Sequence, residues 1–162
     1  MKSGHAAAPG PAERARLLAG LAQAPAAAAR FLLGQLLVRR FEGEVRAARI
    51  VETEAYLGEG DAAAHVFRGR TARNAPLWER PGTIYVYLVY GMHHCLNLAV
   101  EREGAAGCVL IRAAEPVAGL SPGDCRGPGR LCRALALDTS DSGGHVFARG
   151  SRLLLREGIA PL

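Results

Sequence analysis

Lysine is almost absent from this sequence, because Lys2 is the only one among 162 residues. Schiff-base chemistry needs an amine nucleophile, which only Lys2 or the amino terminus could supply. Both lie in residues 1–10, whose Ala, Pro and Gly content predicts a disordered tail. The sequence therefore argues against covalent catalysis by lysine.

Long apolar runs are missing as well. The opening MKSGHAAAPGPAERAR lacks the apolar core of a signal peptide, and no stretch is apolar over the length that a membrane span requires. We therefore expect a cytoplasmic protein, associated with the nucleoid if bacterial, that makes no membrane contact.

Metal-binding spacings are also absent. His93, His94 and Cys95 are consecutive in an expected strand, where neighbours alternate between faces, so they are poor co-ligands and no metal is expected. Without any Cys-x-x-Cys spacing, we expect buried or incidental thiols at all the cysteines, which are Cys95, Cys108, Cys125 and Cys132.

Arginine supplies the remaining basic charge, with a formal net charge of +5 and a pI near 9.4. Its planar guanidinium suits bidentate contact with phosphate. The charge balance thus favours an acidic partner such as a nucleic acid backbone, although a solvated basic surface is the alternative.

With 49% hydrophobic residues, the chain has enough apolar surface for one domain over residues 11–162. A hairpin around Glu42-Gly43 and a following three-strand meander predict an α+β fold with a mainly antiparallel sheet and packed helices. We expect helices at 11–23, 25–33, 76–79 and from 127, and strands at 35–41, 45–56, 83–90, 94–100, 107–113, 146–148 and 152–155.

The stretch RIVETEAY places two carboxylates in the second expected strand. Strand alternation would put Ile50, Glu52, Glu54 and Tyr56 on one face. On an open face these acids would be ordinary surface charges. In a cleft, one of them could deprotonate a water for glycosidic-bond hydrolysis.

The meander contributes aromatic side chains. A tip at residues 91–93 would pair Tyr90 with His94 and Tyr87 with Asn97. An aromatic ring beside an amide suits a flat heterocycle, and Tyr90 would project from the tip like an intercalating wedge. The alternative for each tyrosine is ordinary packing within a strand.

Two arginines complete the candidate set. Arg112 follows the apolar run at residues 108–111 and reaches either a cleft or, alternatively, bulk water. Arg130 ends the segment GPGR that opens a helix, where free backbone N–H groups could bind phosphate, although Gly and Pro are common at helix starts for conformational reasons alone.

Together these segments resemble the alkyladenine (3-methyladenine) DNA glycosylase family over roughly residues 30–156. The matching segments, in order, are LLGQLLVRR, RIVETEAY, DAAAH, RN, PGTIYVYLVYGMHHCLN, CVLIRAAEP and GPGRLCRAL. The resemblance implies a curved sheet and a monomeric base-excision-repair enzyme without cofactor. It would flip alkylated or deaminated purines, such as 3-methyladenine or hypoxanthine, out of double-stranded DNA and remove them by hydrolysis.

The resemblance also implies a role for each matching residue. Glu54 would be the catalytic base and Arg112 would help to place the water and the DNA backbone, while Glu52 receives no chemical role and is expected to be a support beside an arginine. The remaining roles are a base pocket of Tyr56, His65, Tyr87 and Asn97, a wedge at Tyr90, and DNA backbone contacts by Arg73 and Arg130.

The sequence departs from the family in two places. Only residues 117–126 join the AEP and GPG segments, and the C-terminus is shorter than expected. Either peripheral elements are trimmed, or the pocket wall is incomplete and the chain is a catalytically silent nucleic-acid-binding relative. A sugar glycoside hydrolase using Glu52 and Glu54 as a pair about 7 Å apart is a third reading.

Overall fold

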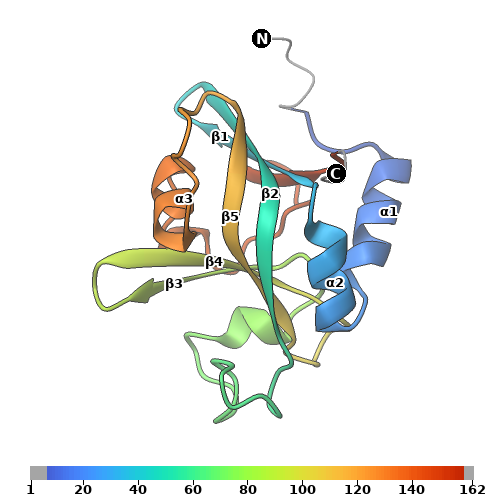
Figure 1. The fold of residues 1–162 in the computed structure, drawn as a ribbon. Coiled ribbons are helices and arrows are strands. Elements are labelled where there is room, and N and C mark those ends of the chain that lie inside the picture. The colour runs from blue at the N-terminus through green and yellow to red at the C-terminus, as the bar shows by residue number, and fades with distance from the viewer. Residues whose placement is uncertain (1–6, 159–162) are drawn as a thin grey trace.

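The computed structural model describes residues 7–158, and all its strands join one curled antiparallel sheet (Figure 1). The strand order is β3-β4-β5-β2-β1-β6. The predicted α+β class is therefore confirmed. The strands are β1 Leu36–Phe41, β2 Glu44–Tyr56, β3 Ile84–Val89, β4 His93–Ala99, β5 Cys108–Ala118 and β6 Leu153–Arg156.

The helices begin where proline fixes the backbone, because its φ suits the first turn and its missing N–H is not needed there. They are α1 Pro11–Leu21, α2 Pro25–Leu32 and α3 Pro128–Ala134, with 3-10 turns η2 Ala75–Trp78 and η3 Thr139–Asp141. Figure 1 shows α1 and α2 together on one flank of the sheet, with α3 on another beside β5. No helix among residues 7–158 is long and apolar enough to cross a membrane.

The expected tail of residues 1–10 lies partly outside the described residues. Residues 7–10 lead into α1, and the Ala7 carbonyl accepts a hydrogen bond from Arg156 at 2.6 Å. The expected domain of residues 11–162 is described as far as residue 158.

The main core lies between the helices and the sheet. Leu17, Leu32 and Leu131 come from the three helices and are fully buried in one apolar cluster with residues of the sheet. A smaller apolar cluster, centred on Tyr85, Val66 and Leu77, packs on a different part of the sheet. This smaller cluster is the one that carries the candidate site.

The long ladder between β2 and β5 is irregular at Glu52, where the register shifts on both sides. Ile50 and Ala55 both pack on the main core although they are an odd number of residues apart. Tyr56 packs instead on the smaller cluster. The predicted common face for Ile50 with Glu54 and Tyr56 is therefore wrong, because a bulge reverses the alternation between them.

The β3–β4 hairpin turns one residue earlier than predicted. Tyr90 and Gly91 both have positive φ, at 52° and 66°, and the Met92 N–H donates to the Val89 carbonyl at 3.0 Å. Consequently Tyr87 lies opposite Cys95, and Tyr85 lies opposite Asn97. The predicted pairs Tyr90–His94 and Tyr87–Asn97 are wrong. The pairing moves by two residues, so Tyr87 and Asn97 still share a face.

Two other expected strands also differ. β5 continues through Pro116 to Ala118, past its predicted end at residue 113. Residues 146–148 form a turn, and only the preceding His145 makes an isolated bridge, to Thr83. The last expected strand is present as β6, which pairs with β1.

Candidate active site

Glu54, on β2, is held through both carboxylate oxygens. Arg112 Nη1 on the neighbouring strand β5 donates to Oε2 at 2.8 Å, and the Tyr56 hydroxyl donates a short hydrogen bond to Oε1. The side chains of Glu54 and Arg112 are 41% and 44% exposed, so the pair contributes little to stability. Its geometry nevertheless fixes a charged carboxylate in one orientation beside a guanidinium.

Tyr56 connects this acid to an aromatic pocket. Burial is the main cause that raises the pKa of Tyr56 to about 12, and the hydrogen bond to Glu54 is the second. The hydroxyl therefore stays protonated and acts as a hydrogen-bond donor. The cavity at this site measures ≈ 30 Å³, which leaves room for a water molecule but not for a purine. Its lining residues are Tyr56, Ala63, His65, Leu77, Tyr85, Tyr87, Asn97 and Cys108.

The rings of this pocket are in contact. His65 and Tyr87 have ring centroids 4.1 Å apart at an interplanar angle of 53°, and His65 Nδ1 lies 3.0 Å from the Tyr85 hydroxyl. Burial, together with the positive charge of Arg73, lowers the pKa of His65. A neutral imidazole therefore lies against two tyrosine rings and provides a flat, largely uncharged wall.

Asn97 supplies the polar floor. It is 3% exposed, and its Oδ1 lies 3.9 Å from the Cys108 thiol, whose pKa burial raises to about 12. Its Nδ2 has no hydrogen-bond partner within the described part of the chain. The amide thus presents an uncommitted donor at the pocket.

The hairpin tip projects away from this pocket. Tyr90 is 93% exposed and Met92 is 72% exposed, whereas most large apolar side chains of the chain are buried. Arg73 braces the hairpin, because its Nη2 donates to the Leu88 carbonyl at 3.0 Å and its guanidinium lies 5.9 Å from the centre of the Tyr87 ring.

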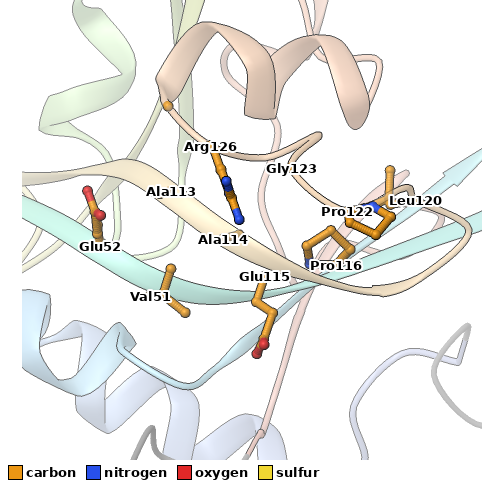
Figure 2. Close-up of a pocket in the computed structure, with 11 residues that line it drawn as sticks. Val51, Glu52, Ala113, Ala114, Glu115, Pro116, Leu120, Pro122, Gly123 and Arg126 are labelled. Carbon is orange, nitrogen blue, oxygen red and sulfur yellow. The ribbon is translucent and has the colours of Figure 1, made fainter.

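Glu52 and Arg130 lie apart from these groups. Glu52 is exposed and makes no hydrogen bond or ion pair with any described residue, so the expected arginine partner is absent. It lines a hollow of ≈ 900 Å³ together with Val51, Glu115 and Arg126 (Figure 2). Arg130 lines a different hollow beside α3.

No group of three or more His, Cys, Asp or Glu side chains is arranged to hold a metal within residues 7–158. All four cysteines are free and buried. The pocket is therefore built from aromatic rings, one amide, one thiol and an adjacent carboxylate–guanidinium pair.

A family model described as methylpurine-DNA glycosylase (MPG) matches residues 19–161. The chain belongs to the methylpurine-DNA glycosylase family. This confirms the resemblance and extends it from residues 30–156 to include α2 and the end of α1.

Methylpurine-DNA glycosylase family members from several organisms are similar to this chain in sequence. Three are named "Putative 3-methyladenine DNA glycosylase". The Myxococcus xanthus protein is 54% identical over 110 residues, which cover 67% of this chain and 57% of that protein. The Chlorobium phaeovibrioides protein is 48% identical over 129 residues (72% and 66%), and the Methanocella arvoryzae protein is 45% identical over 144 residues (82% and 72%). The chain thus spans less than two thirds of the length of the first two relatives.

In this member of the methylpurine-DNA glycosylase family, the pocket also contains Tyr85 and Cys108, two residues with polar side-chain atoms that were not among the predicted site residues. Tyr85 lies two positions before Tyr87 on the same strand, so strand alternation could have identified it. Cys108 starts β5 and looked like a structural thiol. The structure brings together Tyr56, His65, Tyr87 and Asn97, and it places Glu54 and Arg112 beside them. Their roles in binding and catalysis stay predictions.

Proposed function

We propose that this chain is a monofunctional DNA glycosylase that hydrolyses the N-glycosidic bond of alkylated or deaminated purines in duplex DNA. Membership of the methylpurine-DNA glycosylase family supports the class of enzyme. The observation that carries the proposal is the pair of hydrogen bonds that orient Glu54 directly beside an aromatic pocket.

Base recognition requires the damaged nucleotide to leave the helix. Extrusion costs a few kcal/mol, and least where the base is mispaired or damaged. In the free protein His65 lies against Tyr87 and the cavity is only ≈ 30 Å³. A purine therefore enters by separating these rings, and its flat face then stacks between them in place of their mutual contact.

The chemistry falls to Glu54 and its two neighbours. The carboxylate accepts a proton from water as the water oxygen bonds to the sugar C1′, while the C1′–N bond breaks and its electron pair leaves with the base. Arg112 and Tyr56 hold the carboxylate in orientation. A cationic alkylated purine is a good leaving group, so little acid catalysis is needed.

The surface around the pocket fits the DNA partner. Tyr90 would fill the space left by the flipped base, and Arg73 and Arg130 would contact the backbone. Each protein molecule would act as a monomer on one lesion in cytoplasmic, nucleoid-associated DNA. Asn97, with its uncommitted donor, would oppose the amino group of normal guanine.

The decisive test compares wild type with Glu54→Gln on end-labelled duplexes that carry hypoxanthine or a methylated adenine, followed by alkali. Loss of the carboxylate should slow base release by about 10² to 10⁴-fold, which is the usual contribution of a general base. Glu52→Gln is the matched control, because this acid lies two residues away on the same strand and is exposed without a partner.

Equal release by wild type and Glu54→Gln would refute the assignment of the base. Tight lesion binding without strand breaks from either protein would identify a catalytically silent binding relative. Activity lost equally in Glu52→Gln and Glu54→Gln would instead favour a paired-carboxylate mechanism.

A further inference from the structure

A second large hollow, ≈ 840 Å³, lies between α3 and the adjoining ends of β2 and β5. It is lined by four guanidinium groups and one carboxylate. We call it the arginine hollow, and its charged lining residues are Arg46, Arg126, Arg130, Arg133 and Asp124.

Most of this positive charge is unpaired. Arg126, Arg130 and Arg133 are exposed and make no side-chain hydrogen bond or ion pair with another described residue. Asp124 accepts a hydrogen bond from the Ser121 N–H at 2.7 Å, so this acid is engaged in its own turn. Like charges gathered in one concavity repel each other, and a bound polyanion relieves that repulsion.

The backbone that carries these arginines is firmly anchored. Arg126 forms a β-bridge with Ala113, and the Ala114 N–H donates to the Cys125 carbonyl at 3.0 Å. Within α3, Leu131 and Cys132 lie between the solvent-facing Arg130 and Arg133 and are almost completely buried. The guanidinium groups therefore extend from fixed positions.

One arginine is anchored more fully than the rest. Arg46 Nη1 donates to the Ala134 carbonyl at 2.9 Å, and its Nη2 lies 3.1 Å from Glu44. This contact closes the far end of the hollow against the last turn of α3.

The arginine hollow begins beside the candidate catalytic pair. Arg126 pairs with Ala113, the residue after Arg112, and Arg112 holds Glu54. Figure 2 shows Arg126 reaching from the loop before α3 toward β5, with Glu52 at one end of the neighbouring hollow and Leu120 and Pro122 at the other. A DNA strand leaving Glu54 would thus meet Arg112 first and Arg126 next.

The charges that line the two hollows also indicate which of them a DNA strand would follow. The neighbouring ≈ 900 Å³ hollow exposes Glu52 and Glu115, which would repel a phosphate backbone. α3 is about 10 Å long at 1.5 Å per residue, and a DNA strand carries one charge per 3.4 Å of helix axis. The length of α3 is therefore comparable to the spacing of a few successive phosphates of one strand.

We propose that the arginine hollow binds consecutive phosphates of one DNA strand beside the extruded nucleotide. Arg126 and Arg133 are the new contacts, and guanidinium forks suit them to phosphate oxygens. This inference rests on the proposed function for its choice of DNA as the polyanion. It adds a binding surface outside the base pocket that acts on damaged and undamaged DNA alike.

The test measures the salt dependence of duplex binding by fluorescence anisotropy, for wild type and for the double variant Arg126→Gln/Arg133→Gln. Each lost phosphate contact lowers the slope of log K against log salt by about 0.9. The double variant should therefore lose a slope of about 2. Between 50 and 200 mM salt, wild type should then weaken roughly tenfold more than the variant does.

The matched control is Arg30→Gln/Arg102→Gln. It removes the same net charge at exposed positions, one on α2 and one in the turn before β5, that lie outside the arginine hollow. Thermal unfolding of both double variants should match wild type, and Arg133→Lys should keep the wild-type slope. A slope for Arg126→Gln/Arg133→Gln equal to that of the control overturns the proposal.

The readout also separates this proposal from the proposed function. Base release by wild type, the double variant and Glu54→Gln is therefore measured beside the salt slope, with enzyme in saturating excess so that weaker binding does not limit the rate. An unchanged slope with normal Glu54-dependent release overturns the arginine hollow alone. An absence of base release from wild type overturns the glycosylase, whatever the slope shows.

Discussion

At the scale of single residues, Glu52 and Glu54 show how surroundings separate two identical side chains. They lie two positions apart on β2, yet only Glu54 receives hydrogen bonds from Arg112 and Tyr56. Glu52 stands at the bulge, where the pairing with β5 shifts on both sides. The spacing of the acids therefore does not create a catalytic pair, because only one is oriented.

Tyr90 is another residue whose position suits function better than stability. Its φ of 52° lies in the left-handed region, and its ring is 93% exposed. A non-glycine residue in that region costs about 1–2 kcal/mol. A turn selected only for stability would favour Asn or Gly at this position.

We therefore expect Tyr90→Gly to weaken binding to a lesion duplex by about 1–3 kcal/mol, the usual contribution of one base-stacking aromatic side chain. Its midpoint of urea unfolding should be unchanged or slightly higher, because glycine relieves the backbone strain. Binding is measured by anisotropy at fixed salt, and unfolding by circular dichroism. Met92→Ala, at the same tip, is the control, and unchanged affinity in Tyr90→Gly would argue against a wedge.

At the scale of secondary-structure elements, local signals predicted well wherever one residue dictates the backbone. Pro11 and Pro25 start α1 and α2, and Glu42-Gly43 turns the first hairpin, all as the sequence indicated. Residues whose conformation depends on distant packing were predicted less well. The β2 bulge is matched by an irregularity in β5, which a single strand cannot reveal.

The hairpin between β3 and β4 was also predicted imperfectly, with its tip displaced by one residue. The predicted tip at residues 91–93 and the observed tip at residues 90–92 are both three-residue loops. The conformational freedom of glycine favours a loop that starts at Gly91. The observed turn instead places Tyr90 in the left-handed region. This difference changes the pairing in the pocket, because Tyr85 rather than Tyr87 lies opposite Asn97. The contact between His65 and Tyr85 joins a loop to a strand, and no local pattern encodes it.

A buried ion pair ties β1 to the turn η3 and supplies a prediction about the elements. Arg39 is 1% exposed, and its Nη1 lies 2.7 Å from Asp141, while its Nη2 donates to the Ala136 carbonyl at 2.7 Å. Arg39→Met should lower the free energy of unfolding by about 3–5 kcal/mol, because it leaves the Asp141 carboxylate buried beside a neutral side chain.

Urea unfolding measures this loss. Arg70→Gln is the control, because the Arg70–Glu79 pair is about half exposed on both sides and should contribute less than about 1 kcal/mol. Similar losses in the two variants would show that the Arg39 pair is compensated by water or by Arg152, whose Nη2 lies 3.5 Å from Asp141.

At the scale of the whole molecule, charge is distributed unevenly. Near α1, Arg16 pairs with Glu157 and Arg156 pairs with Glu13. Around α3 the arginines outnumber the acids, and Arg126, Arg130 and Arg133 have no side-chain partner among the described residues. Unpaired arginines therefore gather in the arginine hollow, while the ion pairs near α1 hold residues 156–157 to that helix.

Two histidines with lowered pKa values, the buried His145 and the exposed His65 that packs on Tyr87, make the stability of the fold depend on pH. His145 accepts a hydrogen bond from the Phe147 N–H at Nδ1, and its Nε2 lies 2.7 Å from the Pro81 carbonyl, so the ring is held neutral. Burial lowers the pKa of His145, and it lowers the pKa of His65 as well. Because these folded-state pKa values lie below the unfolded value of about 6.5, the unfolded chain binds protons first. Stability should therefore be fully present above about pH 7 and should decline as the pH falls through 6.5 and below.

Urea midpoints at pH 7.5 and 5.5 measure the decline, and His145→Gln, which can still donate to Pro81, should make it shallower. An equal decline in wild type and His145→Gln would show that other groups, such as Glu13 with its lowered pKa, dominate the acid response.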